Sequence, residues 1–93
     1  MVLDTAARLS VDSAYERWDD AERAWEAVEW VLARDPLVGV PLSEKGNVRG
    51  FVYDGAKSIR QPDIDVIYEI TDNEIIVRSA EFTDAKFSQA GRA

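Results

Sequence analysis

The sequence predicts an α+β domain in which two helices pack on one face of an antiparallel sheet of three or four strands. Three observations lead to this class. Apolar residues recur at helical spacing in the N-terminal part, residues further along alternate with the period of two that is typical of strands, and a proline separates the two regions. The 93 residues, 46% of them hydrophobic, suffice for one domain with a single core.

The helical region carries one apolar stripe and two start signals. The stripe residues are spaced by three or four: Ala14, Trp18, Ala21, Trp25, Val28 and Leu32. Ser13 with Glu16 matches a capping box, and the same spacing recurs from Asp19. We therefore predict a short helix over residues 10–18 and a longer one over 20–34, with one continuous helix as the alternative. The off-stripe tryptophan of this region, Trp30, is expected to be at least partly buried.

The segments on either side of the helices are less regular. Residues 2–9 do not alternate cleanly, and fit either a first strand or an irregular lead-in. Asp35-Pro36 ends the helical region, because proline disfavours the α conformation at the residue before it. Residues 37–47 are punctuated by Gly and Pro, which predicts a loop.

Three strands are predicted after this loop, over residues 48–53, 63–70 and 75–82. The second strand places aliphatic residues and Tyr68 on one face, and we expect that face to pack against the helix stripe. Residues 71–74 form a tight turn in this interpretation. The third strand is apolar on both faces, which suits a central position in the sheet. The last residues, 83–93, are predicted as a short helix or a flexible tail.

The connection between the first two strands contains two turn signals. Asp54-Gly55 has the composition of a two-residue hairpin turn, but the residues after it are too few and too polar for a return strand. We therefore predict a bulge or kink at Asp54-Gly55 and a turn over residues 60–63, which places Pro62 just before the second strand, where its missing N–H costs nothing.

Composition excludes several classes of function. The chain has no histidine and no cysteine, which rules out the usual zinc sites, Ser-His-Asp triads and thiol nucleophiles. Its acidic residues lack the spacing of a calcium loop, so we predict no metal site and no cofactor. No apolar run is long enough for a transmembrane helix, and the first residues lack a signal-peptide pattern. We therefore expect a cytoplasmic protein without membrane contact.

The net charge of −7 argues against a protein that binds nucleic acid by neutralising many phosphates. The charge is uneven along the chain. Residues 1–45 hold 10 acids and 5 bases, a net of −5, and residues 46–93 hold 8 acids and 6 bases, a net of −2. The C-terminal half is therefore able to present a local cationic surface.

Three stretches together resemble the RelE/ParE superfamily of bacterial type II toxin–antitoxin systems. They are AERAWEAVEWVLARDPLVGVPL, VRGFVYDGAKSI and IDVIYEITDNEIIVRSAEF. The likeness covers residues 10–82 and consists of element order and hydrophobic pattern rather than an invariant motif. It implies a single RelE/ParE-like domain over residues 1–93 and a small cytoplasmic toxin that an antitoxin holds inactive. RelE-like members cleave messenger RNA on the ribosome, and ParE-like members poison DNA gyrase.

The resemblance also implies candidate catalytic residues. Arg49 matches a basic position on the first long strand, Arg60 or Lys57 is the candidate for a second, and Arg78 lies on the last strand. The basic pair that ends the RelE-like pattern is replaced here by Glu81-Phe82, and the aromatic residue that follows is Phe87, which cannot transfer a proton. Whether the chain is an enzyme is therefore left open. An active form would be a ribosome-dependent endoribonuclease.

The functional expectation is a toxin-like component of a type II system, of the kind that serves plasmid stabilisation. It would bind a cognate antitoxin and a cellular target, either gyrase or the ribosome with its messenger RNA, and a homodimer is left open. Lys57, Tyr68 and Phe82 are the candidate partner-binding residues. Each candidate also has a plain structural interpretation, as a solvated sheet charge or a packed aromatic. The alternative function is a non-enzymatic α+β protein-interaction module that is unrelated to toxin activity.

Overall fold

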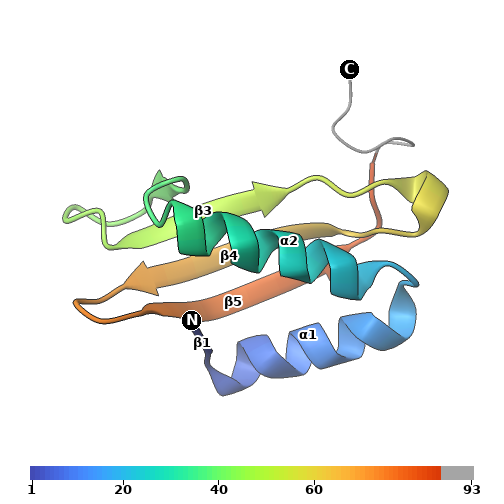
Figure 1. The fold of residues 1–93 in the computed structure, drawn as a ribbon, viewed down its shortest axis with the longest axis horizontal. Coiled ribbons are helices and arrows are strands. Elements are labelled where there is room, and N and C mark those ends of the chain that lie inside the picture. Colours follow the sequence, from blue (N-terminus) through green and yellow to red (C-terminus); the bar gives the residue numbers. More distant parts are fainter. Residues whose placement is uncertain (87–93) are drawn as a thin grey trace.

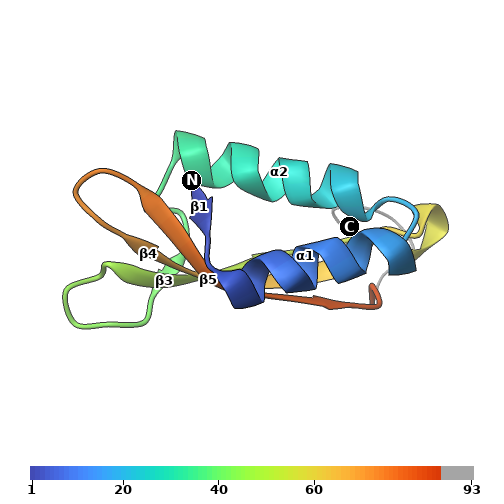
Figure 2. The ribbon, with the colours of Figure 1, turned by 90° about the horizontal axis from the view of Figure 1, so that it is seen from below.

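The computed structural model describes residues 1–86 and consists of two helices on one face of a five-stranded sheet (Figures 1 and 2). The elements are β1 (Val2–Leu3), α1 (Thr5–Arg17), α2 (Ala21–Arg34), β2 (Val40–Pro41), β3 (Val48–Tyr53), a 3-10 turn (Lys57–Ile59), β4 (Asp63–Ile70) and β5 (Ile75–Thr83). The predicted α+β class is confirmed. The prediction for the tail falls mostly on residues 87–93, which lie outside the described residues.

The sheet is mixed, with strand order β1-β5-β4-β3-β2. β1 runs parallel to β5, whereas the other neighbouring strands are antiparallel. The predicted antiparallel sheet of three or four strands is therefore wrong in both strand number and direction. The physical reason is length, since β1 and β2 have two residues each and a pair of residues shows no alternation. β2 lies within residues 37–47, and its short length is also the reason that the sequence predicts a loop there.

α1 begins earlier than predicted, at Thr5 rather than residue 10. Asp4 is its N-cap residue, and the Asp4 carboxylate accepts a hydrogen bond from the Ala7 N–H at 3.1 Å. Ser13 and Glu16, which match a capping box in the sequence, lie inside the helix. Residues 2–9, predicted as a first strand or an irregular lead-in, instead comprise the two-residue β1, the cap residue Asp4 and the first part of α1.

The predicted break between two helices is confirmed. Trp18 is the C-cap of α1, has an extended backbone, and donates its N–H to the Ala14 carbonyl at 3.0 Å. α2 begins after Asp20, whose carboxylate accepts from Gln61 Nε2 at 2.8 Å instead of capping the helix. The helix ends at Arg34, directly before Asp35-Pro36, as predicted.

The core lies between α2 and the covered face of the sheet. Its largest members come from the predicted helix stripe and the predicted strand face: Trp25, Val28, Leu32, Ile64, Val66, Tyr68 and Val77. Trp18 belongs to a smaller cluster with Ala14, Ala21 and Phe82. The expectation for Trp30 is wrong, since this side chain is 62% exposed on the outer surface of α2, beside the Arg34 guanidinium.

α1 covers the part of the β5 edge that β1 leaves unpaired. β1 pairs only with Ile76 and Val77, and the rest of β5 runs alongside α1 (Figure 1). The helix residues buried here are small, Ala7, Val11 and Ala14, which allows a close approach of the helix to the strand. An edge strand with free backbone groups invites pairing with other chains, and the helix blocks that route.

The connection from β3 to β4 is a compact loop over residues 54–62, not a two-residue hairpin turn. Ala56 and Gln61 form an isolated antiparallel bridge around the 3-10 turn. The Gly55 N–H donates to the buried carboxylate of Asp63 at 2.7 Å, and a Cβ on Gly55 would overlap the backbone of Pro62. β3 ends at Tyr53, directly before Asp54-Gly55, and the close approach at Gly55 requires a residue without a side chain, whereas the turn predicted over residues 60–63 lies at Lys57–Arg60.

Candidate functional site

The residues selected from the sequence do not form one surface. Arg49 lies on β3 and holds the connector between α2 and β3. Its Nε donates to the Gly46 carbonyl at 2.7 Å, and its Nη1 donates to the carbonyls of Gly39 at 2.8 Å and Leu37 at 3.1 Å. These three bonds engage the guanidinium with backbone oxygen atoms. Arg49 therefore has a structural task in the described fold.

Tyr68 is fully buried beneath the same connector. Its hydroxyl donates to the Pro36 carbonyl at 2.7 Å and accepts from the Gly39 N–H at 3.0 Å. A side chain on Gly39 would come within 2.7 Å of this hydroxyl, so the connector passes close over the ring. With no exposed surface, Tyr68 offers nothing for a partner to contact in this conformation.

Arg78 and Phe82 lie apart from each other on β5. Arg78 forms an ion pair with Glu69 on the neighbouring strand, with Nη2 and Oε1 2.8 Å apart. Phe82 is half-buried and packs against both Trp18 and Trp25, with ring centroids 6.4 and 6.1 Å away. Phe87 lies outside the described residues.

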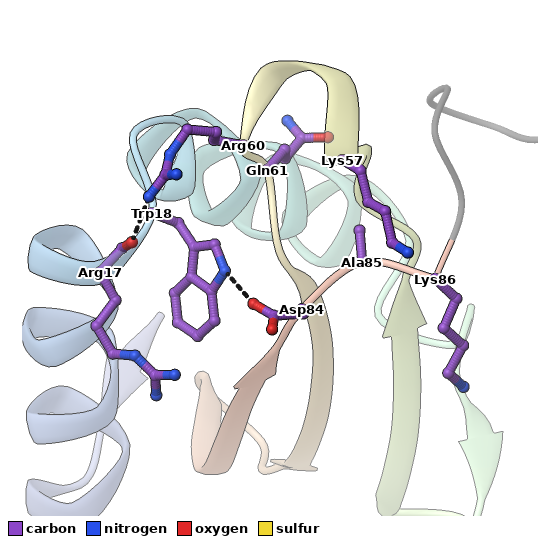
Figure 3. Close-up of a pocket in the computed structure, with 8 residues that line it drawn as sticks. All are labelled: Arg17, Trp18, Lys57, Arg60, Gln61, Asp84, Ala85 and Lys86. Carbon is purple, nitrogen blue, oxygen red and sulfur yellow. Dashed lines mark hydrogen bonds between the residues drawn. The ribbon is translucent and has the colours of Figure 1, made fainter.

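Lys57 and Arg60 both line a pocket of about 550 Å³ near the N-terminal end of β4, where the Arg60 side chain points toward the end of α1 and the Lys57 side chain points toward Ala85 (Figure 3). The pocket is lined by Arg17, Trp18, Lys57, Arg60, Gln61, Asp84, Ala85 and Lys86. We refer to this site as the cationic pocket. Its residues come from the end of α1, the loop before β4 and the segment after β5, so three separate parts of the chain build it.

The polar contacts around Trp18 shape the wall of the cationic pocket. The indole Nε1–H donates to the Asp84 carboxylate at 3.0 Å, and the Arg17 guanidinium lies 4.3 Å from the centre of the indole ring. Arg60 reaches back to α1, because its Nη2 donates to the Arg17 carbonyl at 3.2 Å. Arg60 has a left-handed backbone with φ of 53°, and this conformation directs the loop toward the end of α1.

Two further hydrogen bonds connect the loop between β3 and β4 to β3 and to the start of α2. The Tyr53 hydroxyl donates to Gln61 Oε1 at 3.2 Å, and Gln61 Nε2 donates to Asp20 at 2.8 Å. Burial raises the pKa of Tyr53, and the nearby charge of Asp20 raises this pKa further, so the hydroxyl keeps its proton at neutral pH. Gln61 is therefore held at the pocket from two sides.

The charge balance at the pocket is opposite to that of the whole chain. Four lining residues are cationic (Arg17, Lys57, Arg60 and Lys86), and only one, Asp84, is acidic. Arg60 also pairs with the exposed carboxylate of Asp19 at 3.0 Å, a contact that solvent weakens. Within residues 1–86, Arg17, Lys57 and Lys86 form no ion pair.

This arrangement suits the binding of an anion. Guanidinium and ammonium groups hold their protons at neutral pH, so they attract carboxylate or phosphate groups but are poor general bases. Among residues 1–86, no group of three or more acidic side chains is placed to hold a metal ion. Nor does any helix in this part of the chain have the length and apolar character needed to cross a membrane.

Sequence reasoning selected two of the four cations and missed Arg17 and Lys86. These two residues lie far apart along the chain and carry no local pattern that marks them. One available signal was Trp18 at the predicted end of the first helix, because an indole N–H at a helix end needs a polar partner. The pairing of that N–H with Asp84 brings the segment after β5 to the end of α1.

Comparison of the chain with protein-family models, with curated proteins and with solved structures gave no match. The RelE/ParE resemblance thus stays a hypothesis based on element order and hydrophobic pattern.

Proposed function

We propose that this chain is a toxin-like protein of the RelE/ParE type that acts by binding, and that the cationic pocket receives an acidic segment of a cognate antitoxin. The observation that carries the proposal is the gathering of Arg17, Lys57, Arg60 and Lys86 at one pocket of a chain with net charge −7. The order of one strand, a helix pair and further strands supports the toxin part of the proposal.

A protein segment fits this pocket better than a nucleic acid does. A long polyphosphate would be repelled by the acidic remainder of the chain, whereas a short peptide brings only a few carboxylates. Trp18 and Ala85 supply apolar wall next to the cations, which suits a segment that mixes acids with aliphatic side chains. The pocket would therefore select an acidic, partly apolar peptide.

Binding accounts for the described residues better than cleavage of messenger RNA does. Of the three arginines that the resemblance nominates for catalysis, Arg49 is engaged by backbone carbonyls and Arg78 by Glu69. Only Arg60 lies at the pocket. In this proposal the chain binds its cellular target, the ribosome or gyrase, without cleaving RNA, and the antitoxin blocks that contact.

The test is genetic and biochemical together. Expression of the chain in a bacterial host is expected to arrest growth, and co-expression of the small protein encoded by the adjacent reading frame is expected to relieve the arrest and to co-purify with the chain. If the two proteins form a complex but the chain alone leaves growth unchanged, the interaction-module alternative is favoured. Absence of both arrest and complex would overturn the proposal.

A further inference from the structure

The sheet face that the helices leave uncovered carries an aliphatic patch. β3 alternates across the sheet, so Phe51 and Tyr53 pack against the core and Val52 points to the uncovered face. Four side chains form the patch: Val40 is 67% exposed, Val52 61%, Leu42 57% and Ile67 39%. Figure 2 shows both helices on the opposite side of the sheet.

The strand register places these side chains together. Gly50 is opposite Val40 on one side and Ile67 on the other, so the three residues form a row across β2, β3 and β4. A Cβ on Gly50 would lie 3.4 Å from Leu42 Cδ1, so Leu42 lies over the glycine. The absence of a side chain at Gly50 lets Leu42 pack onto the strand between the flanking aliphatic groups.

An acidic pair borders the patch. Asp65 is opposite Val52 on β3 and opposite Glu81 on β5, so the two carboxylates face each other across β4 and β5 on this same uncovered side. Like charges directly opposite each other destabilise a sheet. In the part of the chain that the structure describes, neither carboxylate forms an ion pair. A cation from outside the described residues would relieve this repulsion.

We propose that this uncovered face binds a basic amphipathic segment of a partner protein. Aliphatic side chains of the segment would cover Val40, Leu42, Val52 and Ile67, and its Lys or Arg side chains would reach Asp65 and Glu81. This surface has the opposite charge to the cationic pocket and borders it at Glu81, which lines a hollow together with Arg17 and Trp18. The inference therefore does not depend on the toxin-like function proposed above.

Charge selects this occupant over the other candidates. A nucleic acid or an anionic membrane would meet Asp65 and Glu81 with charge of the same sign. A second copy of the chain that docked by this face would bring a second acidic pair to the same interface. Of these candidates, only a basic amphipathic segment makes favourable contacts with both the aliphatic patch and the acidic pair.

The test uses two synthetic peptides that share the same leucine positions, with lysine at the other positions in one and glutamate in the other. Titration into isotopically labelled full-length chain, followed by NMR, is expected to shift the amide signals of β3, β4 and β5 residues around Val52 and Ile67 with the lysine peptide. The glutamate peptide is expected to leave these signals unchanged. Equal response to both peptides, or lysine-peptide shifts confined to α2, would overturn the proposal.

A matched pair of variants separates specific docking from general attraction to an acidic chain. Asp65→Lys with Glu81→Lys is expected to weaken lysine-peptide binding at least tenfold. Glu22→Lys with Glu26→Lys makes the same change in net charge on exposed positions of α2 and is expected to weaken it less than threefold. Equal loss in both variants contradicts the proposal.

Two further measurements keep the result unambiguous. Lys57→Glu with Arg60→Glu, which alters the cationic pocket, is expected to leave lysine-peptide binding unchanged. This result distinguishes failure of the proposal for the uncovered face from failure of the proposal for the cationic pocket. Sedimentation of the unmodified chain is expected to show a monomer. If it shows a dimer instead, the Ile67→Lys variant tests whether that dimer forms through this face. A dimer that this substitution abolishes would show that a second copy occupies this face and would contradict the proposal.

Discussion

Among single residues, Tyr68 combines complete burial with two hydrogen bonds to one connector. We expect Tyr68→Phe to lower the free energy of unfolding by about 1–3 kcal/mol, because the buried Gly39 N–H loses its acceptor. Urea denaturation measures this change. Tyr53→Phe is the matched control, since that hydroxyl is only part-buried and forms one bond of 3.2 Å, and its cost is expected to be smaller. A larger effect at Tyr53 would contradict this account of the connector.

At the scale of elements, the loop between β3 and β4 depends on Gly55. A methyl group there would overlap the carbonyl oxygens of Gln61 and Pro62, which belong to rigid backbone. We expect Gly55→Ala to destabilise the fold by about 1–3 kcal/mol or more. Because this loop supplies Lys57, Arg60 and Gln61 to the cationic pocket, we also expect weaker peptide binding there. Gly50→Ala is the control, because its nearest contact is a flexible leucine side chain at 3.4 Å. Thermal unfolding that ranks the two substitutions in the opposite order would contradict this account.

Elements with a strong local pattern could be predicted from the sequence, and elements set by long-range contacts could not. The β3 bounds follow from clean alternation over 48–53, and the buried face of β4 follows from the series that contains Tyr68. The start of α1 was misplaced because Ser13 carries a capping pattern although Asp4 provides the actual cap. The direction of β1 depends on its pairing with Ile76, which no local pattern records.

For the whole molecule, the cationic residues that the sequence nominates do not gather at one place in the fold. Arg49, Arg60 and Arg78 were expected to act together, yet the fold distributes them among the connector, the pocket and the uncovered sheet face. Arg17 and Lys86 join Arg60 only because α1 and the segment after β5 meet at Trp18 and Asp84. The sequence marks Trp18 as a residue that needs a polar partner, but it does not identify Asp84 as that partner.

The same distribution leads to a prediction about catalysis. We expect the purified chain to show little ribosome-dependent cleavage of messenger RNA, because Arg49 is committed to backbone carbonyls and Glu81-Phe82 replaces the basic pair of the RelE-like pattern. Primer extension on a translated message measures cleavage. Robust cleavage that Arg49→Ala abolishes, in a variant shown by circular dichroism to be folded, would show that the site has been misassigned.

Binding of an acidic peptide at the cationic pocket is expected to change the surroundings of the Trp18 indole, whose Nε1–H signal is resolved by NMR. We expect titration with the glutamate–leucine peptide to shift this signal and to leave the signal of the exposed Trp30 in place. Lys57→Glu with Arg60→Glu is expected to weaken binding at least tenfold, about 1.4 kcal/mol. Arg8→Glu with Lys45→Glu, which makes the same change in net charge at exposed positions, is expected to have little effect. An unmoved Trp18 signal, or equal loss in both variants, would contradict the proposed binding at the cationic pocket.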